Sequence, residues 1–487
     1  MPALPPARAG LRTRSAAGPR HHRPGPSGPS GQSGPSGPAG TVVRPATPPG
    51  RPVDRPGRRR TGRPGHDRHG AGTGTGRPDS GPPPLGTRTG SPRHRSGGPD
   101  SRTARLRTRV LSRLSRADRE VLWLYLLTRT GLWVTAYCAR WLFPSDGDTR
   151  EPGSVLAPFA QWDWAHYLQV ARNGYFPEGT EPFHSGEDNR VAFFPGFPLL
   201  LRAVHAVVPH WTAAGLLISF VAGAVAVLAL GRVARLYLPD VRAGSHAVTF
   251  LLVSPCAIFL AAGYTEALFL ALALPAWLAA HRCNWPLAGL LAALANSVRV
   301  SGLFLAAAMV LHFVLSARRC GHARHWPWLA VPAVPPLLYS WYLQVLTGDW
   351  MAWKHAQERG WYRTFHTPWD TWANTWDAAF GASRPTGYAF MFQAELVAAL
   401  VGLLLLALLI RRRQWPEAAY IGLTLWALGT SYWYTSLPRS TLLWWPLWIV
   451  LASWSLRTPW VRTAYLCLAA PLTTVFALTF LTGRWTG

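Results

Sequence analysis

The sequence predicts an all-α protein that crosses a membrane many times and is preceded by a long disordered tail. Apolar segments of membrane-spanning length recur from Val121 onward. Tryptophan, of which the chain holds 26, does not occur before Trp123. Glycine, proline and arginine are instead concentrated before the first apolar segment, as is typical of chains that do not fold.

These two compositions divide the chain into two predicted parts. Residues 1–116 are basic and rich in proline and glycine, so they bury too little apolar surface to offset the entropy of ordering them. We expect a disordered cytoplasmic tail that is attracted to anionic membrane lipid. The net charge of +27 does not indicate a nucleic-acid partner, because the tail has no aromatic ring on which a base could stack. Residues 117–487 form the predicted membrane domain.

About eleven crossings fit the membrane domain. They are predicted at 121–143, 211–231, 244–262, 265–281, 285–299, 301–317, 326–347, 388–410, 415–433, 441–456 and 460–481. Residues 194–209 are expected to lie along the outer surface, because prolines, Arg202 and His205 interrupt their apolar pattern. Every inside turn is then basic, which predicts a multi-pass protein of the cell membrane with a cytoplasmic N-terminus. If residues 194–209 cross the membrane instead, the orientation of everything after them is inverted.

This orientation places two long polar segments outside, residues 144–193 and 348–387. The first contains eight of the 18 acidic side chains of the membrane domain, so we expect a reaction site on the extracytoplasmic face. Its acidic residues are Asp146, Asp148, Glu151, Asp163, Glu178, Glu181, Glu187 and Asp188.

The densest polar cluster lies in Gln161-Trp-Asp-Trp-Ala-His-Tyr167. If this stretch is helical, Asp163, His166 and Tyr167 share one face, and Asn173-Gly174 ends the helix. A single outer carboxylate is what a sugar hydroxyl needs as a general base in glycosyl transfer. The same residues also fit an interfacial helix anchored by its aromatic rings.

Further candidates occur at the outer ends of the apolar segments. Arg190 is a cation beside the acidic segment, and Glu266 follows Tyr264 at the start of an apolar helix. Arg299 either pairs with Glu266 or binds a lipid phosphate. Arg439 is a second phosphate candidate, or else an interfacial arginine that extends to the membrane surface.

The second outer segment is rich in tryptophan. Its indole rings can stack on sugars, and Asp349 and Gln357 can bind hydroxyls, although an ordinary aromatic belt has the same composition. The chain has no GxGxxG, Walker or HExxH motif. We therefore predict no cofactor and no metal, and we expect a lipid-linked sugar as donor.

Several motifs resemble those of the PIG-V-type mannosyltransferases, which are related to the second mannosyltransferase of GPI-anchor synthesis and have many actinobacterial members. The motifs occur in the family's order over residues 121–460. They are Trp162-Asp163 with Tyr167 and Gly174-Tyr175, Ala192-Phe-Phe-Pro-Gly-Phe-Pro198, Tyr264-Thr-Glu-Ala-Leu-Phe269, Arg299-Val-Ser-Gly302, Gly348-Asp349 with Gln357, Trp361 and Arg363, and Pro438-Arg439.

The resemblance implies a GT-C glycosyltransferase with a large first outer loop. Such an enzyme moves mannose from polyprenyl-phosphate-mannose to an acceptor, here a glycolipid or a glycan, and inverts the anomeric centre in one displacement. The acidic residue that activates the acceptor maps onto Asp163. The predicted substrate-binding residues are His166, Tyr167, Arg190, Tyr264, Glu266, Arg299, Asp349, Gln357 and Arg439. The arginine-rich, lysine-poor composition also looks actinobacterial.

The sequence leaves three other functions open. A lipid or glycan transporter would use intramembrane charges and broken helices, but no inverted repeat is visible. A protein O-mannosyltransferase is less favoured, because Trp164 follows Asp163 where that family has an Asp-Glu pair. A non-catalytic scaffold subunit would tolerate substitution of Asp163 and Arg299.

Overall fold

The computed structural model describes residues 114–143, 154–176, 189–316 and 324–486. Within these ranges the chain forms helices joined by turns and short loops, and no strand. This confirms the predicted all-α class. The predicted disordered tail up to residue 113, seven of the eight acidic residues of the first outer segment and the arginines at 318 and 319 lie outside the described residues.

The predicted crossings correspond to helices. In chain order these are α2 (Arg116–Leu142), α5 (Trp211–Tyr237), α6 (Ala243–Leu252) with the short turn η3 (Ala257–Leu260), α7 (Thr265–His281), α8 (Trp285–Val298), α9 (Ser301–Leu315), α11 (Val334–Thr347) preceded by η5 (Trp326–Leu329) and η6 (Val331–Ala333), α14 (Thr386–Arg411), α15 (Trp415–Gly429), α17 (Trp445–Arg457) and α18 (Trp460–Leu481).

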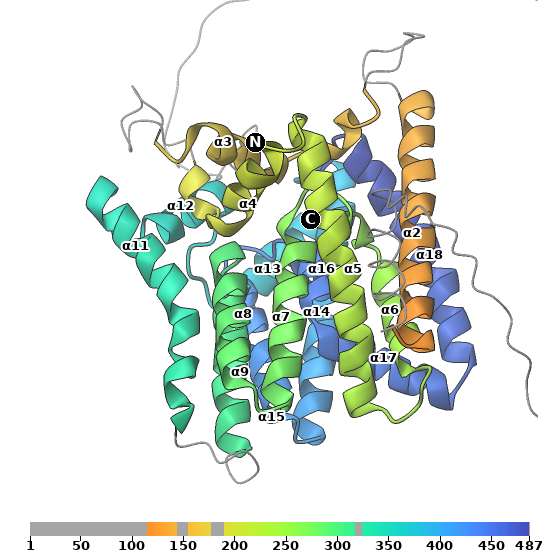
Figure 1. Cartoon of the computed structure of the whole chain (residues 1–487). Coiled ribbons are helices and arrows are strands. Elements are labelled where there is room, and N and C mark those ends of the chain that lie inside the picture. The colour runs from red at the N-terminus through yellow and green to blue at the C-terminus, as the bar shows by residue number, and fades with distance from the viewer. Residues whose placement is uncertain (1–113, 144–153, 177–188, 317–323, 487) are drawn as a thin grey trace, which may run out of the picture. The chain divides into compact units, whose positions relative to one another are not determined.

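Shorter elements connect these helices. They are η1 (Ala157–Phe159), α3 (Asp163–Asn173), η2 (Arg190–Ala192), α4 (Gly196–His205), α12 (Ala352–Trp361), α13 (Pro368–Phe380), α16 (Leu437–Ser440) and η7 (Thr441–Leu443). Figure 1 shows α3, α4 and α12 together at one end of the long helices. The α5–α6 and α14–α15 turns lie at the other end.

Four segments among the described residues are long and apolar enough to cross a membrane: Trp211–Tyr237, Trp326–Thr347, Thr386–Arg411 and Trp460–Leu481. The apolar helices α6 to α9 are shorter, at 10–17 residues. They contain many fully buried side chains, because they pack among the other helices. These features are those of a multi-pass membrane protein.

Residues 194–209 form one short helix and a turn. Their helix α4 has 10 residues, which span about 15 Å, or roughly half the thickness of the hydrocarbon core. α4 packs against α3 at the end of the bundle, with Phe197 and Leu201 buried and Leu199 exposed. The prediction that this segment lies along a surface therefore agrees with its length and place.

Ion pairs join α2 to α5 at the opposite end of the bundle. The Asp118 carboxylate accepts hydrogen bonds from Arg235 at 2.8 Å and from Arg232 at 3.1 Å. At the same end, the Tyr237 hydroxyl of α5 donates to Glu417 of α15 and accepts from the Trp277 indole at 3.0 Å. These contacts fix the ends of the helices far from α3.

Trp164 fastens α3 to the bundle. Its side chain is 2% exposed and lies against Gly215 of α5 and Gly263, which precedes α7. A Cβ atom at Gly215 would lie 2.5 Å from the indole ring, and one at Gly263 would lie 2.6 Å from it. Glycine is therefore needed at both positions to admit the ring, and Asp163 is fixed in place beside it.

Substituting Gly263 by alanine tests this close approach. We expect Gly263→Ala to destabilise the protein by about 1–3 kcal/mol, because the new methyl group overlaps Trp164. Thermal unfolding of the purified protein in detergent measures the effect. Gly131→Ala on α2 is the matched control, because nothing lies within 4 Å of a Cβ there. Equal melting temperatures for the two variants would refute the packing described for Trp164.

Candidate active site

The entry to α3 is a sharp turn at Trp162. This residue has a φ of +52°, a strained conformation for a residue with a side chain. Its indole donates a hydrogen bond to the Arg484 carbonyl at 3.1 Å, and the Tyr264 hydroxyl donates to the Gln161 carbonyl at 2.6 Å. The turn makes Asp163 the first residue of α3, which ends at Asn173 before Gly174, as predicted.

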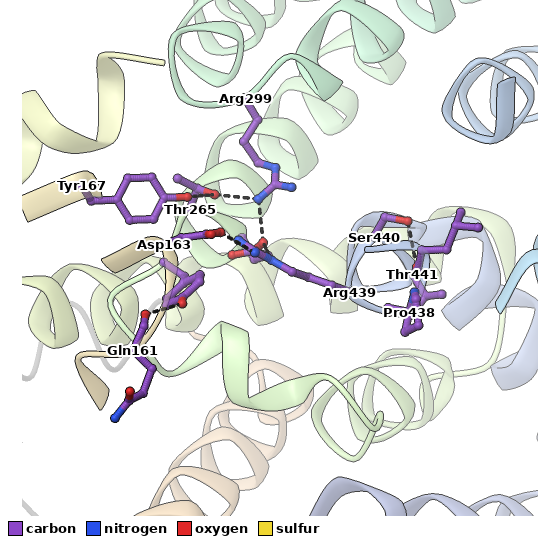
Figure 2. A network of polar contacts seen from close by, with 12 residues as sticks. Gln161, Asp163, Tyr167, Thr265, Arg299, Pro438, Arg439, Ser440 and Thr441 are labelled. Carbon is purple, nitrogen blue, oxygen red and sulfur yellow. Dashed lines mark hydrogen bonds and ion pairs between the residues drawn. The ribbon is translucent and has the colours of Figure 1, made fainter. Parts of the chain in front are cut away.

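Four charged side chains meet beyond this turn (Figure 2). Arg439 Nη1 donates to Asp163 Oδ2 at 2.6 Å, and Arg439 Nε donates to Glu266 Oε1. Arg299 Nη1 donates to the same Glu266 oxygen at 2.6 Å. The structure therefore shows the pairing of Arg299 with Glu266, one of the two alternatives left open by the sequence.

The network is buried and its formal charges balance. The side chain of Glu266 is not exposed, and those of Arg439, Asp163 and Arg299 are 8%, 14% and 22% exposed. The Arg439 guanidinium also lies 4.8 Å from the ring centre of Tyr264, a favourable contact for a cation. Burial opposes the charge of Arg439, but Glu266 and Asp163 hold its pKa well above the usual value.

Neutral hydroxyl groups extend this network. Arg299 Nη1 also donates to Thr265 Oγ1 at 2.6 Å, and the Tyr167 hydroxyl lies 3.4 Å from the same oxygen. Burial raises the pKa of Tyr167, so its phenol stays protonated at neutral pH. Figure 2 shows Tyr167 and Arg299 approaching Thr265 from different sides.

A cavity of about 180 Å³ adjoins the network. Six of the predicted site residues line it: Asp163, Tyr167, Tyr264, Arg299, Gln357 and Arg439. Trp162, Trp361 and Trp485 add indole rings to its wall, whereas the tryptophans of α13 do not line it. Motifs that lie far apart in the chain therefore supplied residues that line one cavity.

The other four predicted site residues do not line this cavity. Glu266 is unexposed and pairs with the two arginines, and Arg190 belongs to η2. His166 stacks on Phe193 with ring centres 4.9 Å apart. Asp349 bonds to His355 at 2.6 Å.

The local contacts of Asp349 fix its charge. Besides the bond to His355, its carboxylate accepts a hydrogen bond from the Met351 N–H at 2.8 Å. Partial burial opposes ionisation, but these two hydrogen bonds lower the pKa of Asp349. Asp349 lies between α11 and α12, and its two hydrogen bonds connect it to the start of α12.

The segment from Arg190 to Pro198 forms one wall of the site through its main chain. The Tyr175 hydroxyl donates to the Phe193 carbonyl at 2.6 Å, and the Tyr339 hydroxyl donates to the Val191 carbonyl at 2.8 Å. The Gln357 amide donates to the Ala192 carbonyl at 3.3 Å. Side chains from three separate parts of the chain therefore hold this segment, which explains its irregular, proline-containing sequence.

Glu395 is a positioning residue that the sequence analysis did not single out. It is fully buried in α14, and its two oxygens accept hydrogen bonds from the N–H groups of Ser436 and Leu437 at 2.6 and 2.8 Å. Ser436 has a φ of +66°, so the turn into α16 depends on this support. Glu395 thereby orients Arg439. The available signal was one carboxylate inside an otherwise apolar helix.

No group of three or more histidine, cysteine, aspartate or glutamate side chains in the described parts of the chain is arranged to hold a metal ion. What the site offers a substrate is therefore a carboxylate, guanidinium groups, hydroxyls and aromatic rings. This combination suits a sugar that carries a phosphate.

Comparison with known proteins bears on what this site does. Residues 143–318 match a family described as "Mannosyltransferase (PIG-V)". The matched segment is similar to that family and covers about a third of the chain. It contains Asp163, Glu266 and Arg299, whereas Arg439 lies beyond it. The predicted resemblance to PIG-V-type mannosyltransferases is confirmed.

Curated relatives support the PIG-V assignment. The chain is 33% identical over 178 residues to GPI alpha-1,6-mannosyltransferase 2 of Mus musculus, which is 34% of this chain and 34% of that protein. It is 34% identical over 161 residues to the Homo sapiens protein of the same name, or 31% and 30% of the two chains. The chain thus matches about a third of the length of these relatives.

Removing the charge of Glu266 tests the buried network. We expect Glu266→Gln to destabilise the protein by about 3–5 kcal/mol, because Arg299 and Arg439 lose their shared buried carboxylate. Glu358→Gln on α12 is the matched control: its pair with Lys354 is half-exposed and contributes about 0–1 kcal/mol. Thermal unfolding in detergent compares the two variants, and equal losses would contradict a special role for Glu266.

Proposed function

We propose that this protein is a membrane mannosyltransferase that moves mannose from a polyprenyl-phosphate-mannose donor to a glycolipid or glycan acceptor. The observation that carries the proposal is the hydrogen bonding of the Asp163 carboxylate, which lies in the segment similar to PIG-V mannosyltransferases. Arg439 binds Oδ2 of Asp163, which lines the cavity. Among the described residues, nothing donates a hydrogen bond to Oδ1.

Asp163 is better suited than Glu266 to act as general base. Glu266 is completely buried, accepts from two arginines and does not line the cavity. A base must come within hydrogen-bonding distance of the proton that it removes. Asp163 meets this condition at the cavity wall, whereas Glu266 balances the charge of the arginines that surround it.

The reaction that we propose is a single displacement. The acceptor hydroxyl gives its proton to Asp163 Oδ1, and its oxygen forms a bond to C1 of mannose. The bond between C1 and the donor phosphate oxygen breaks on the opposite face, and its electron pair leaves with the polyprenyl phosphate. The anomeric centre is thereby inverted, and guanidinium groups stabilise the charge that develops on the phosphate.

The proposed location of the site is the extracytoplasmic face. The arginine-bearing α5–α6 and α14–α15 turns lie at the end of the bundle opposite α3 (Figure 1). Basic turns favour the cytoplasmic side, so α3 and the cavity would face outward. A lipid-linked donor fits this side, because cytosolic nucleotide-sugars do not reach it.

The Asp163→Asn variant tests the proposed general base. We expect mannose transfer from polyprenyl-phosphate-mannose in membranes to fall at least about 100-fold, with unchanged expression, because general-base catalysis contributes factors of about 10²–10⁴. Asp370→Asn is the matched control, since this residue is exposed on α13. Activity of Asp163→Asn close to that of the control would exclude Asp163 as base.

Cysteine labelling tests the proposed orientation. In a background from which every cysteine except the buried Cys256 is removed, Trp369→Cys on α13 and Arg411→Cys at the end of α14 each introduce one thiol at an exposed position. We expect a membrane-impermeant maleimide to label Trp369→Cys in intact cells and Arg411→Cys only after permeabilisation. The reverse pattern would place the site on the cytoplasmic face.

A further inference from the structure

The cavity beside Asp163 contains a third arginine, Arg363, which the sequence analysis mentioned only as part of a family motif. Asp163 and Glu266 are paired with Arg439 and Arg299. Among the described residues, no side chain or carbonyl forms a hydrogen bond or ion pair with the Arg363 guanidinium. Its Nε is buried without a partner. Arg363 is thus a cation with no directly bonded carboxylate, although Glu395 and Asp163 lie near enough to favour its charge.

The backbone holds Arg363 in place from both sides. Tyr362, which follows α12, has a φ of +54°, and its carbonyl accepts a hydrogen bond from the Tyr432 N–H at 3.1 Å. The His366 N–H donates to the Thr430 carbonyl at 2.9 Å. Burial lowers the pKa of Arg363 to about 10, so the side chain still carries its charge at neutral pH.

Two further features of the same cavity favour an anion. The Thr435 hydroxyl is buried, lines the cavity and has no hydrogen-bond partner. α9, a helix of 15 residues, begins at the cavity wall with Ser301. The N-terminus of a helix carries partial positive charge and free N–H groups, both of which stabilise a phosphate. A buried polar atom without a protein partner is available to bind a water molecule or a ligand.

Apolar side chains line the part of the cavity formed by α9 and α15. Phe304 of α9 and Ala427 and Leu428 of α15 line the cavity, and Ala427 is also exposed. α9 and α15 pack side by side. Beside Ala427, Trp426 is 60% exposed. The cavity wall along α9 and α15 is therefore apolar and reaches an exposed residue, which suits a lipid chain attached to an anion at Arg363.

We propose that Arg363, the Thr435 hydroxyl and the first turn of α9 form a subsite for the phosphate of a lipid phosphate, with the lipid chain leaving between α9 and α15. This inference rests on the proposed function, in which the donor is a phosphate-linked sugar. It assigns the main phosphate contact to Arg363, whereas Arg439 serves to hold Asp163. Arg299 both lines the cavity and pairs with Glu266, so it belongs to the cavity wall and to the buried charge network.

Ligand binding without turnover tests the subsite. The probe is farnesyl phosphate, added to the purified full-length protein in detergent, and the readout is the concentration at which it half-maximally stabilises the protein against heat. Farnesol and inorganic phosphate are the comparison ligands. We expect farnesyl phosphate to stabilise the wild type and farnesol to have no effect at the same concentration. Stabilisation by inorganic phosphate at equal concentration would overturn the assignment to a lipid phosphate.

Variants then separate the contributions of the two side chains. We expect Arg363→Gln to weaken farnesyl phosphate binding about tenfold or more, because a charge-assisted hydrogen bond is lost. Thr435→Val keeps the shape of the side chain and removes only its hydroxyl, so we expect weaker binding without loss of melting temperature in the absence of ligand. Arg359→Gln, at an exposed arginine of α12, is the matched control. Unchanged binding by both Arg363→Gln and Thr435→Val would refute the subsite.

The two proposals fail separately. If Asp163→Asn abolishes mannose transfer while Arg363→Gln binds farnesyl phosphate like the wild type, the subsite is wrong and the proposed function stands. If the wild type transfers no mannose but binds farnesyl phosphate through Arg363, the subsite stands and the proposed function is wrong.

Discussion

The site depends on a single guanidinium group placed between two carboxylates. Arg439 contacts Asp163 and Glu266, which precede it by 276 and 173 residues. One side chain thus ties the start of α3 and the start of α7 to the turn that carries α16. A buried cation in this position requires both carboxylates, and each carboxylate requires a cation, because an unpaired charge in a buried site is costly.

The surrounding structure serves to hold this group. Glu395 binds the main chain of the α16 turn, so the arginine approaches from a fixed direction. On the other side, Trp164 is wedged between Gly215 and Gly263 and keeps Asp163 within reach. These supports come from different helices. The relative positions of α3, α5, α7 and α14 are therefore fixed by the polar contacts around Arg439 as well as by apolar packing.

Local sequence patterns predicted the elements of the site well. Asn173-Gly174 ends α3 as expected, and Glu266 and Arg299 lie at the helix boundaries that hydropathy placed beside them. The partners of these charges could not be predicted, because spacing along the chain does not show which distant turns meet. Glu395 illustrates this limit, since its function is defined by a turn 41 residues away. His166, which was predicted to share the face of Asp163 in α3, stacks on Phe193, a partner that spacing along the chain did not reveal.

The fit of Trp164 against two glycines also bears on how this sequence can evolve. A methyl group at residue 215 or 263 overlaps the indole ring, so neither position can acquire a side chain while the tryptophan is present. If the ring were first replaced by a smaller residue, alanine at both positions would fill the space that it left. The order of the changes therefore decides whether they are tolerated, and residues 164, 215 and 263 are expected to vary together among related sequences.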